Sequence, residues 1–448
     1  MPLDKDNGAL LGERLEEILS SYEGNPTNPI VRRALSRTSL SDAAYDPACE
    51  ALSTPHFSVH VKTMPVTNQK SSGRCWIFAG LNILREIVAK KLGVKEFELS
   101  QNYISLYDKI EKANYALESV IALAEEEPSS RVLMHILSCP VSDGGQWDMF
   151  VNLVAKYGLL PKDAFPETYQ SNATREGNFL VNAAIRDFAK QAHALAISGK
   201  KEEIRPLKEK LIAKIYAFFL NSFGVPPKQF DLQYEDKDGK YHIERDLTPK
   251  SFFEKYVGDA IYAYQSLINS PTADKPFLRA YTVDWLGNVI EGKPINHLNV
   301  SMERMEEAII AQLQDGEPVW FGSDVAFFRD RSSHSWNSRS FDYLDSYGLD
   351  IAFDKAGMLD YRHSAMNHAM VIVGVDLVDG KPRKWKIENS WGSEGGIKGY
   401  YVMDEEWFAR FVYQAVVDRK YLTGEEVEAA KSEPIHLDPW DPMGTLAD

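Results

Sequence analysis

Cys75 lies where a polar, glycine-containing loop meets a strongly apolar segment, a setting in which a thiol becomes a nucleophile. The loop reads Gln69-Lys-Ser-Ser-Gly-Arg-Cys75, and the apolar run 77–84 follows almost directly. This run predicts a buried helix, and the N-terminus of a helix presents free N–H groups and a partial positive charge that favour a thiolate. Together with the side-chain amide of Gln69, the same N–H groups are suited to stabilise an oxyanion.

A thiolate nucleophile needs a base and a group that orients this base, and the C-terminal half of the chain supplies both. His368 opens a strand-like apolar run, and Asn389 directly follows another. The amide oxygen of Asn389 would accept a hydrogen bond from one imidazole nitrogen and leave the other nitrogen to face Cys75. Trp391 is expected to shield this hydrogen bond from water, because a low local dielectric strengthens it.

Each of these residues also has an ordinary structural interpretation. A single cysteine in an intracellular protein is more often a small buried hydrophobe than a nucleophile, and Cys49 and Cys139 keep that interpretation. A histidine at the start of an apolar strand is often a satisfied core residue. For Cys75 and His368, the predicted helix start and the matching partners favour catalysis instead.

The sequence contains no convincing set of metal ligands. His363 lies five residues before His368, which by itself suggests metal ligation. The chain lacks a matching set of Glu or Cys residues at ligand spacing. We therefore predict neither a metal nor a cofactor.

The composition limits the partners and the cellular location that the protein can have. The 448 residues include 50 Lys and Arg against 65 Asp and Glu, and the resulting formal charge of −15 disfavours nucleic acids and anionic membranes as partners. Three cysteines are too few for a disulfide framework, and the N-terminus does not read as a signal peptide. No apolar run approaches the ~20 residues that a membrane span needs. We expect a cytoplasmic protein with no membrane partner and no nucleic-acid partner.

Helical patterns dominate the first two thirds of the chain, and strand patterns dominate the rest. Apolar periodicity, capping residues and breakers predict helices over 75–92, 99–123, 147–157, 175–225 and 302–313. Asp236-Lys-Asp-Gly239 predicts a hairpin, and Thr248-Pro249 predicts a helix start. Short strand-like runs at 319–322, 368–374, 384–388 and 399–403 predict an antiparallel sheet or small barrel.

The chemistry-bearing residues resemble those of a known family. The order Gln69, Cys75, His368, Asn389 is similar to the papain superfamily, as are the pairs Cys75-Trp76 and Asn389-Ser-Trp-Gly392. Almost three hundred residues separate the cysteine from the histidine, about twice the ~130–150 of papain and cathepsins, so a large insertion is expected. This insertion, with the segments Gly316-Glu-Pro-Val-Trp-Phe-Gly322 and Trp440-Asp-Pro-Met-Gly-Thr-Leu-Ala447, resembles the bleomycin hydrolase and bacterial aminopeptidase C family.

The resemblance implies an α+β fold with a papain-like, two-lobed cysteine protease core. This core has a helical lobe and an antiparallel β-barrel lobe, and it carries a large helical insertion and terminal arms. The expected divisions are an N-terminal arm (1–60), the helical lobe (61–165), a mainly helical insertion with oligomer contacts (166–295), the β lobe (296–425) and a C-terminal tail docked in the active-site cleft (426–448).

The resemblance also implies a cysteine aminopeptidase that releases N-terminal residues from short peptides through a thioester. Cys75 would be the nucleophile, and His368 the general base and then the acid. Asn389 would orient His368, and Gln69 with the Cys75 N–H would form the oxyanion hole. The family assembles as a homo-oligomer, a hexameric cage, in which the active sites face a central cavity.

Substrate binding is expected at two further places. Gly144 and Gly145 resemble a segment whose backbone pairs with substrate, although they are otherwise a turn before a helix. Ala447 and Asp448 would anchor the substrate's α-amine through the terminal carboxylate. Because many relatives end nearer to Leu-Ala, Asp448 leaves an endopeptidase of the same family open. A non-catalytic assembly protein or a DNA-binding relative is the third interpretation.

Overall fold

The computed structural model describes residues 8–329, 334–351 and 353–447. Contacts within the chain divide it into two units. The small unit combines 1–52 with 338–352, and the main unit combines 53–337 with 353–448.

The small unit joins two segments that lie far apart in the sequence. Its helices are α1 (Gly12–Gly24), α2 (Asn28–Leu35), α3 (Leu40–Ala44) and α12 (Tyr343–Tyr347). Ser39 caps α3 by accepting the N–H of Asp42 at 3.1 Å. Tyr45 and Phe341 form an antiparallel bridge with tilted rings, so the segment around 341 completes this unit.

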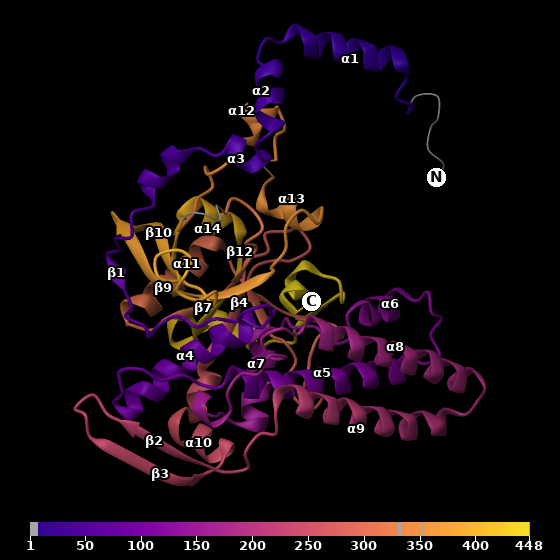
Figure 1. Cartoon of the computed structure of the whole chain (residues 1–448), viewed down its shortest axis with the longest axis vertical. Coiled ribbons are helices and arrows are strands. Elements are labelled where there is room, and N and C mark those ends of the chain that lie inside the picture. Colours follow the sequence, from indigo (N-terminus) through magenta and orange to yellow (C-terminus); the bar gives the residue numbers. More distant parts are fainter. Residues whose placement is uncertain (1–7, 330–333, 352, 448) are drawn as a thin grey trace. The chain divides into compact units, whose positions relative to one another are not determined.

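The helices of the main unit lie between residues 75 and 431, and only some of them begin and end where local signals predicted them (Figure 1). They are α4 (Cys75–Leu92), α5 (Gln101–Ala122), α6 (Arg131–Ser138), α7 (Trp147–Tyr157), α8 (Arg175–Ile197), α9 (Ile204–Phe223), α10 (Pro249–Tyr256), α11 (Met302–Gln314), α13 (Lys355–Asp360), α14 (Glu405–Phe411) and α15 (Gly424–Lys431). Gly93, with a φ of 69°, ends α4 in the left-handed conformation that glycine favours. None of the described helices is long and apolar enough to cross a membrane.

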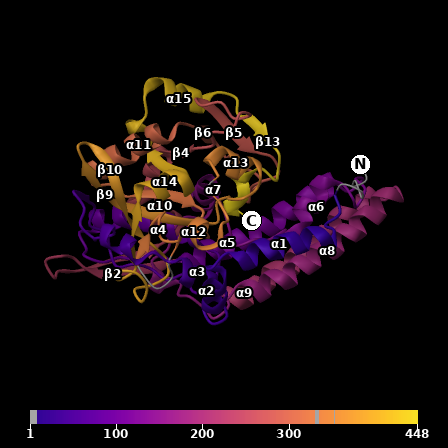
Figure 2. The ribbon, with the colours of Figure 1, turned by 90° about the horizontal axis from the view of Figure 1, so that it is seen from above.

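The helical stretch predicted over 175–225 is two helices rather than one. The break follows Ser198, where Gly199 adopts a φ of 74°. Because few residues other than glycine take this conformation readily, the chain turns here and α9 starts a few residues later. α8 and α9 then pack beside each other and against α5 (Figure 2).

A large mixed sheet forms the other part of the main unit. Among the described residues its order is β13-β5-β6-β4-β12-β7-β9-β10-β11-β8, and β1 also pairs with β9. The strands are β1 (Val59–His60), β4 (Tyr264–Ile268), β5 (Arg279–Val283), β6 (His297–Asn299), β7 (Val319–Ser323), β8 (Ser335–Trp336), β9 (His368–Val378), β10 (Lys381–Glu388), β11 (Tyr400–Asp404), β12 (Val412–Asp418) and β13 (Ile435–Leu437). The predicted α+β class is confirmed, and β7, β9, β10 and β11 pair antiparallel as predicted. The parallel pairs β4–β6, β5–β13 and β8–β11 were not predicted.

The sheet is buried on both faces where it carries the site. Along β9, Ala369 and Val371 belong to the apolar cluster that contains much of α4, whereas Met370 and Ile372 belong to a second cluster with α11. Successive side chains of a strand point to opposite faces, so β9 is held between the two helices. This packing fixes the position of His368, the first residue of β9.

A buried ion pair connects α4 to β10. The guanidinium of Arg85 lies 3.0 Å from the carboxylate of Glu388, and both side chains are nearly inaccessible to solvent. Asn82, also on α4, donates to the same carboxylate oxygen at 2.9 Å, and Thr63 donates to the other oxygen at 2.5 Å. The helix that begins with Cys75 is thereby tied to the strand that leads into Asn389.

We expect Arg85→Met to destabilise the main unit by about 3–5 kcal/mol, because it leaves the Glu388 carboxylate buried without its cation. The midpoint of urea unfolding, followed by tryptophan fluorescence, measures the effect. Lys431→Met is the control, since it removes an exposed ion pair with Glu428 and should change stability by less than about 1 kcal/mol. Equal shifts in the two variants would contradict the role given to the buried pair.

Candidate active site

Cys75 lies at the junction of the helical part and the sheet of the main unit. It is the first residue of α4, and only 4% of its surface is exposed. The backbone N–H of Ala369, the residue after His368, donates to Cys75 Sγ at 3.3 Å. The hydrogen bonds within α4 begin with the N–H groups of Ile77 and Phe78, so helix geometry leaves the N–H of Cys75 without an intrahelical acceptor.

His368 and Asn389 are brought together by the pairing of β9 with β10. The Asn389 side-chain oxygen lies 2.9 Å from His368 Nε2 and also accepts the N–H of Ser390 at 2.8 Å. The Asn389 oxygen can only accept, so Nε2 carries the proton and Nδ1 is left as the basic nitrogen. Trp391 stacks on the imidazole with ring centroids 4.8 Å apart, so its indole covers one face of the His368 ring.

Burial keeps the thiol and the imidazole uncharged. It raises the pKa of the Cys75 thiol to about 11, although the N–H of Ala369 acts in the opposite direction. Burial also lowers the pKa of His368 to about 4, although the hydrogen bond to Asn389 raises it. Burial disfavours an isolated Cys75 thiolate and an isolated His368 imidazolium. The site is therefore suited to transferring the thiol proton from Cys75 to His368 rather than to solvent.

Gln69 is fixed by hydrogen bonds on both sides of its amide. Its Nε2 donates to the carbonyl of Ser72 at 2.6 Å, and its Oε1 accepts from the hydroxyl of Ser390 at 2.6 Å. Its backbone N–H also donates to the carbonyl of Ser390 at 2.8 Å. An amide nitrogen has two protons, so one remains available beside the N-terminus of α4.

Gly144 and Gly145 lie directly against the C-terminal tail. The N–H of Gly145 donates to the carbonyl of Leu446 at 2.9 Å, and the hydroxyl of Ser142 donates to the carbonyl of Ala447 at 2.5 Å. A Cβ on Gly144 would overlap the Leu446 carbonyl oxygen, so only glycine lets the tail approach this closely. The tail therefore pairs with the segment that the sequence analysis assigned to substrate.

The tail is firmly held, and its residues Pro442–Ala447 form a 3-10 helix. Met443 and Leu446 are buried in the apolar cluster that also contains Cys75. The hydroxyl of Thr445 donates to the carbonyl of Met366, two residues before His368, at 2.9 Å. Asp448, the predicted anchor for the substrate amine, lies outside the described residues.

Asp143 holds the loop before Cys75, a role that the sequence analysis missed. Its carboxylate accepts the N–H of Gly73 at 3.0 Å and lies 2.5 Å from the ammonium of Lys109 on α5. Two side chains of the segment 174–178 also donate to it. Burial alone would raise the pKa of Asp143, but Lys109 and these donors outweigh it and hold the pKa well below its usual range.

Lys112, one turn further along α5, binds the backbone of the segment that contains Gly144. Its ammonium donates to the carbonyls of Gly144 and Ser142 and pairs with Asp108 at 3.0 Å. Two sequence features could have indicated these contacts. One is Asp143, an acidic residue next to Gly144, and the other is the spacing of Lys109 and Lys112, which places both on one face of a helix. Neither signal says which loop the lysines meet.

The structure thus brings most of the predicted site residues together. Gln69, Cys75, His368 and Asn389 converge at the start of α4, with Trp391 above the histidine. The arrangement supplies a buried thiol, a basic nitrogen with a fixed tautomer, and N–H donors next to the sulfur. These are the parts that nucleophilic attack on a carbonyl group requires.

Comparisons with known proteins agree with this geometry. The profile described as "Peptidase C1-like family" matches residues 9–444. Aminopeptidase C of Listeria monocytogenes is 42% identical over 435 residues, which cover 97% of this chain and 98% of that protein. Aminopeptidase C of Lactobacillus delbrueckii is 43% identical over 440 residues, with 97% and 98% covered.

A solved structure is similar over the same length. The crystal structure of pepw from Lactobacillus rhamnosis matches with a TM-score of 0.95 and 42% identity, and the match covers 98% of this chain and 99% of that chain. The resemblance to the bacterial aminopeptidase C family is therefore confirmed. The chain belongs to the Peptidase C1-like family.

Proposed function

We propose that this chain is a cysteine-type aminopeptidase that releases N-terminal residues from short peptides. The observation that carries the proposal is the tail paired with Gly144 and Gly145 beside a Cys75, His368 and Asn389 site. The site supplies the chemistry of peptide hydrolysis, and the tail takes the space that any residue preceding the N-terminal one would need. The matched aminopeptidase C relatives support the same activity.

Acylation begins when His368 Nδ1 takes the proton of the Cys75 thiol. The thiolate attacks the carbonyl carbon of the first peptide bond, and the resulting oxyanion accepts hydrogen bonds from the Cys75 N–H and the Gln69 amide. The imidazolium, oriented by Asn389, returns its proton to the leaving amine. The C–N bond breaks, the shortened peptide departs, and the N-terminal residue remains on Cys75 as a thioester.

Deacylation uses the same groups with water in place of the thiol. His368 takes a proton from water, and the hydroxide oxygen attacks the thioester carbonyl. The oxyanion forms in the same hole, and the C–S bond then breaks. The imidazolium proton returns to the Cys75 sulfur, and the free amino acid leaves.

We expect His368→Ala to slow alkylation of Cys75 by iodoacetamide at pH 7 by more than about a hundredfold. Burial raises the pKa of the Cys75 thiol to about 11, so only about one thiol in ten thousand is ionised at pH 7, and in the variant no imidazole takes the proton as the sulfur attacks. The residual rate should rise about tenfold per pH unit up to about pH 10. The wild-type rate should instead fall only toward about pH 4, where His368 becomes protonated.

Peptide mass spectrometry reads this alkylation at Cys75 separately from the exposed Cys139. His436→Ala is the matched control, since that histidine is exposed and pairs only with Asp284 among the described residues. A neutral-pH rate in His368→Ala equal to that of the control would count for the non-catalytic interpretation.

Deletion of residues 446–448 should convert the exopeptidase into a less selective enzyme. In the proposal, the terminal carboxylate pairs with the substrate's α-amine, and a charge-assisted hydrogen bond of this kind is worth about tenfold or more. We expect kcat/KM to fall at least about tenfold for free peptides and to rise for N-acetylated ones. Fluorogenic peptides with free and acetylated N-termini measure both changes.

The deleted protein must keep its Cys75 alkylation rate, which shows that the site is intact. If the alkylation rate is kept and the preference for free amines is also unchanged, the tail is not the anchor. If the full-length protein already cleaves acetylated peptides efficiently, the endopeptidase alternative holds.

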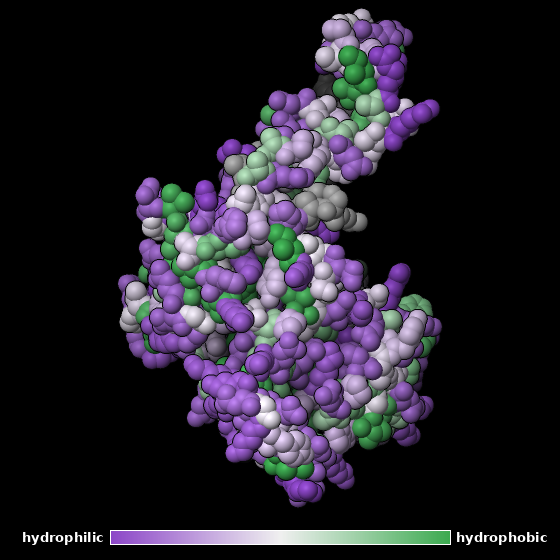
Figure 3. All heavy atoms as spheres, turned by 60° about the vertical axis from the view of Figure 1, so that its left-hand side comes forward, coloured by the Kyte–Doolittle hydropathy of each residue, from purple (hydrophilic) through white to green (hydrophobic). Residues whose placement is uncertain are grey.

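We further propose that the chain forms a homo-oligomer, a hexamer by its resemblance to the family. α1 supports self-association because its apolar residues remain exposed along one stripe, and Figure 3 shows hydrophobic atoms gathered on this helix. The stripe consists of Leu11, Leu15, Ile18, Leu19 and Tyr22, whose exposed fractions run from 38% to 60%. An apolar helix face of this kind normally packs against a partner.

The double variant Leu15→Glu, Ile18→Glu should reduce the mass measured by sedimentation velocity, because it places two charges in the apolar stripe. Ser20→Glu adds a charge outside the stripe and should leave the assembly intact. An unchanged hexamer in the double variant, or a monomeric wild-type protein, would contradict the role of α1.

We also propose that the protein is cytoplasmic. The described cysteines are free, and a reactive thiol stays reduced most readily in a reducing compartment. The net charge of −15 likewise favours short peptides over nucleic acids as partners.

A further inference from the structure

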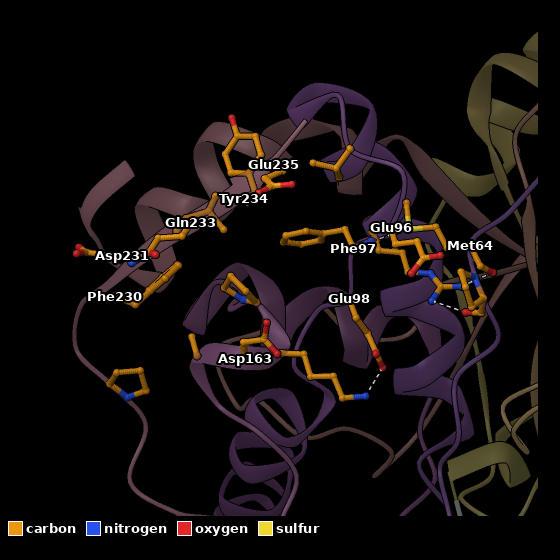
Figure 4. A pocket seen from close by; sticks show the side chains of 18 of the residues that line it. Met64, Glu96, Phe97, Glu98, Asp163, Phe230, Asp231, Gln233, Tyr234 and Glu235 are labelled. Atoms are coloured by element: carbon orange, nitrogen blue, oxygen red, sulfur yellow. Dashed lines mark hydrogen bonds and ion pairs between the residues drawn. The ribbon is translucent and has the colours of Figure 1, made fainter. Parts of the chain in front are cut away.

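A groove of about 700 Å³ runs along a small two-stranded sheet of the main unit. This sheet is the hairpin β2 (Phe230–Glu235) and β3 (Tyr241–Leu247), which the sequence predicted at this place. The opposite wall comes from Val94 and the segments 96–98 and 161–164. Figure 4 shows the side chains of β2 on one side of the space and those of Phe97 and Asp163 on the other. The volume lies within the range of ligand-binding pockets.

The groove follows the free edge of β2. Within the described part of the chain, β2 pairs with β3 on one side and with no strand on the other. Leu232 is buried, and Phe230 packs against Phe252 of α10, whereas Asp231 and Gln233 point outward. All six consecutive residues of β2 nevertheless line the groove, which is possible only if it runs along the strand's edge. Unpaired N–H and C=O groups at such an edge accept an added strand.

The charges around this edge are predominantly negative. The two basic side chains of the groove are already used, since Lys162 lies 2.6 Å from Glu98 and Arg85 pairs with Glu388. The remaining carboxylates sit on both walls. Glu96, Asp163, Asp231 and Glu235 line the groove and make no ion pair with any residue that the structure describes, and Asp231 already accepts the N–H of Asp246 at 3.0 Å.

Aromatic rings lie among these carboxylates. Phe97, Phe230 and Tyr234 all line the groove and are only partly buried. Rings of this kind attract ammonium and guanidinium groups and also pack against the aliphatic stems of lysine and arginine. The carboxylates of the lining therefore complement the charged group of a lysine or arginine side chain, and the aromatic rings complement its aliphatic stem.

We propose that this groove binds an extended basic peptide as a third strand on β2. Its backbone pairs with the free edge, and its lysine or arginine side chains meet Glu96, Asp163 and Glu235. A second copy of this chain is the poorer occupant, because its formal charge is −15 and it would have to place a locally basic segment against this acidic lining. The site shares no residue with the Cys75 cleft, so it stands whether or not the chain is an aminopeptidase.

Fluorescence anisotropy tests the proposal with a labelled seven-residue peptide of alternating lysine and valine, acetylated and amidated at its ends. The full-length protein carries Cys75→Ala, so binding is read without hydrolysis. We expect saturable binding at low salt that weakens as salt is added. A peptide with glutamate in place of lysine should not bind.

Substitution of the carboxylates and N-methylation of the peptide test the ion pairs and the backbone hydrogen bonds separately. The triple variant Glu96→Gln, Asp163→Asn, Glu235→Gln should weaken binding about tenfold, because three exposed ion pairs are lost. The control variant Glu126→Gln, Glu127→Gln, Glu202→Gln removes as many exposed carboxylates elsewhere and should leave binding unchanged. N-methylation of alternate peptide bonds should abolish binding, since it removes the donors that pair with β2.

Equal binding by the triple variant and its control would overturn the proposal, as would full binding of the N-methylated peptide. Sedimentation velocity is run on the same two variants. If the peptide does not bind and only the triple variant changes the oligomeric state, the groove is an interface between copies and the peptide proposal is wrong. Thermal unfolding confirms that both variants, which carry only exposed isosteric changes, remain folded.

Discussion

The buried ion pair between Arg85 and Glu388 is the constraint on which the site's geometry depends. It joins the helix that begins with Cys75 to the strand that runs into Asn389, so it sets how the two halves of the site face each other. Burial raises the pKa of Glu388, and Arg85 acts against this effect by stabilising the carboxylate. Two buried charges of this kind add little net stability, but breaking the pair is costly, and this asymmetry favours one arrangement of helix and strand.

A second set of buried charges fixes the other wall of the cleft. Lys109 and Lys112 project from α5 to the loop that contains Asp143 and Gly144. Asp143 in turn accepts the N–H of Gly73, so the loop before the nucleophile and the loop under the tail are held by one group of charges. The donors next to the sulfur are therefore preorganised by residues that touch no substrate in the proposed reaction.

The tail gives the cleft its shape. Its residues Pro442–Ala447 form a 3-10 helix, from which the carbonyl of Leu446 accepts the N–H of Gly145, and Leu446 is buried in the same apolar cluster as Cys75. In the proposed reaction, one substrate residue precedes the cleaved bond, and the space for any residue before it is taken by the protein itself. An exopeptidase arises from a cleft that would otherwise accept a chain on both sides of the sulfur.

The fold was predictable from sequence wherever the signal was local. The helices α4 and α7 begin and end as predicted, because Gly93 and Gly158 terminate them within a few residues. The strands β7, β9, β10 and β11 were recognisable from short apolar runs between turns. The break at Gly199 was missed, because apolar periodicity continues on both sides of it and one glycine does not fix where a helix ends.

The sequence by itself determined which side chains carry the proposed chemistry, since Cys75, His368 and Asn389 each lie in a recognisable local pattern. Tertiary structure alone decided how these residues meet and what surrounds them. The roles of Asp143 and of the α5 lysines, the parallel strand pairs and the path of the tail all depend on partners far away in the chain. A residue's type and neighbours indicate what it can do, but its partners are chosen by packing of the whole chain, which no local pattern records.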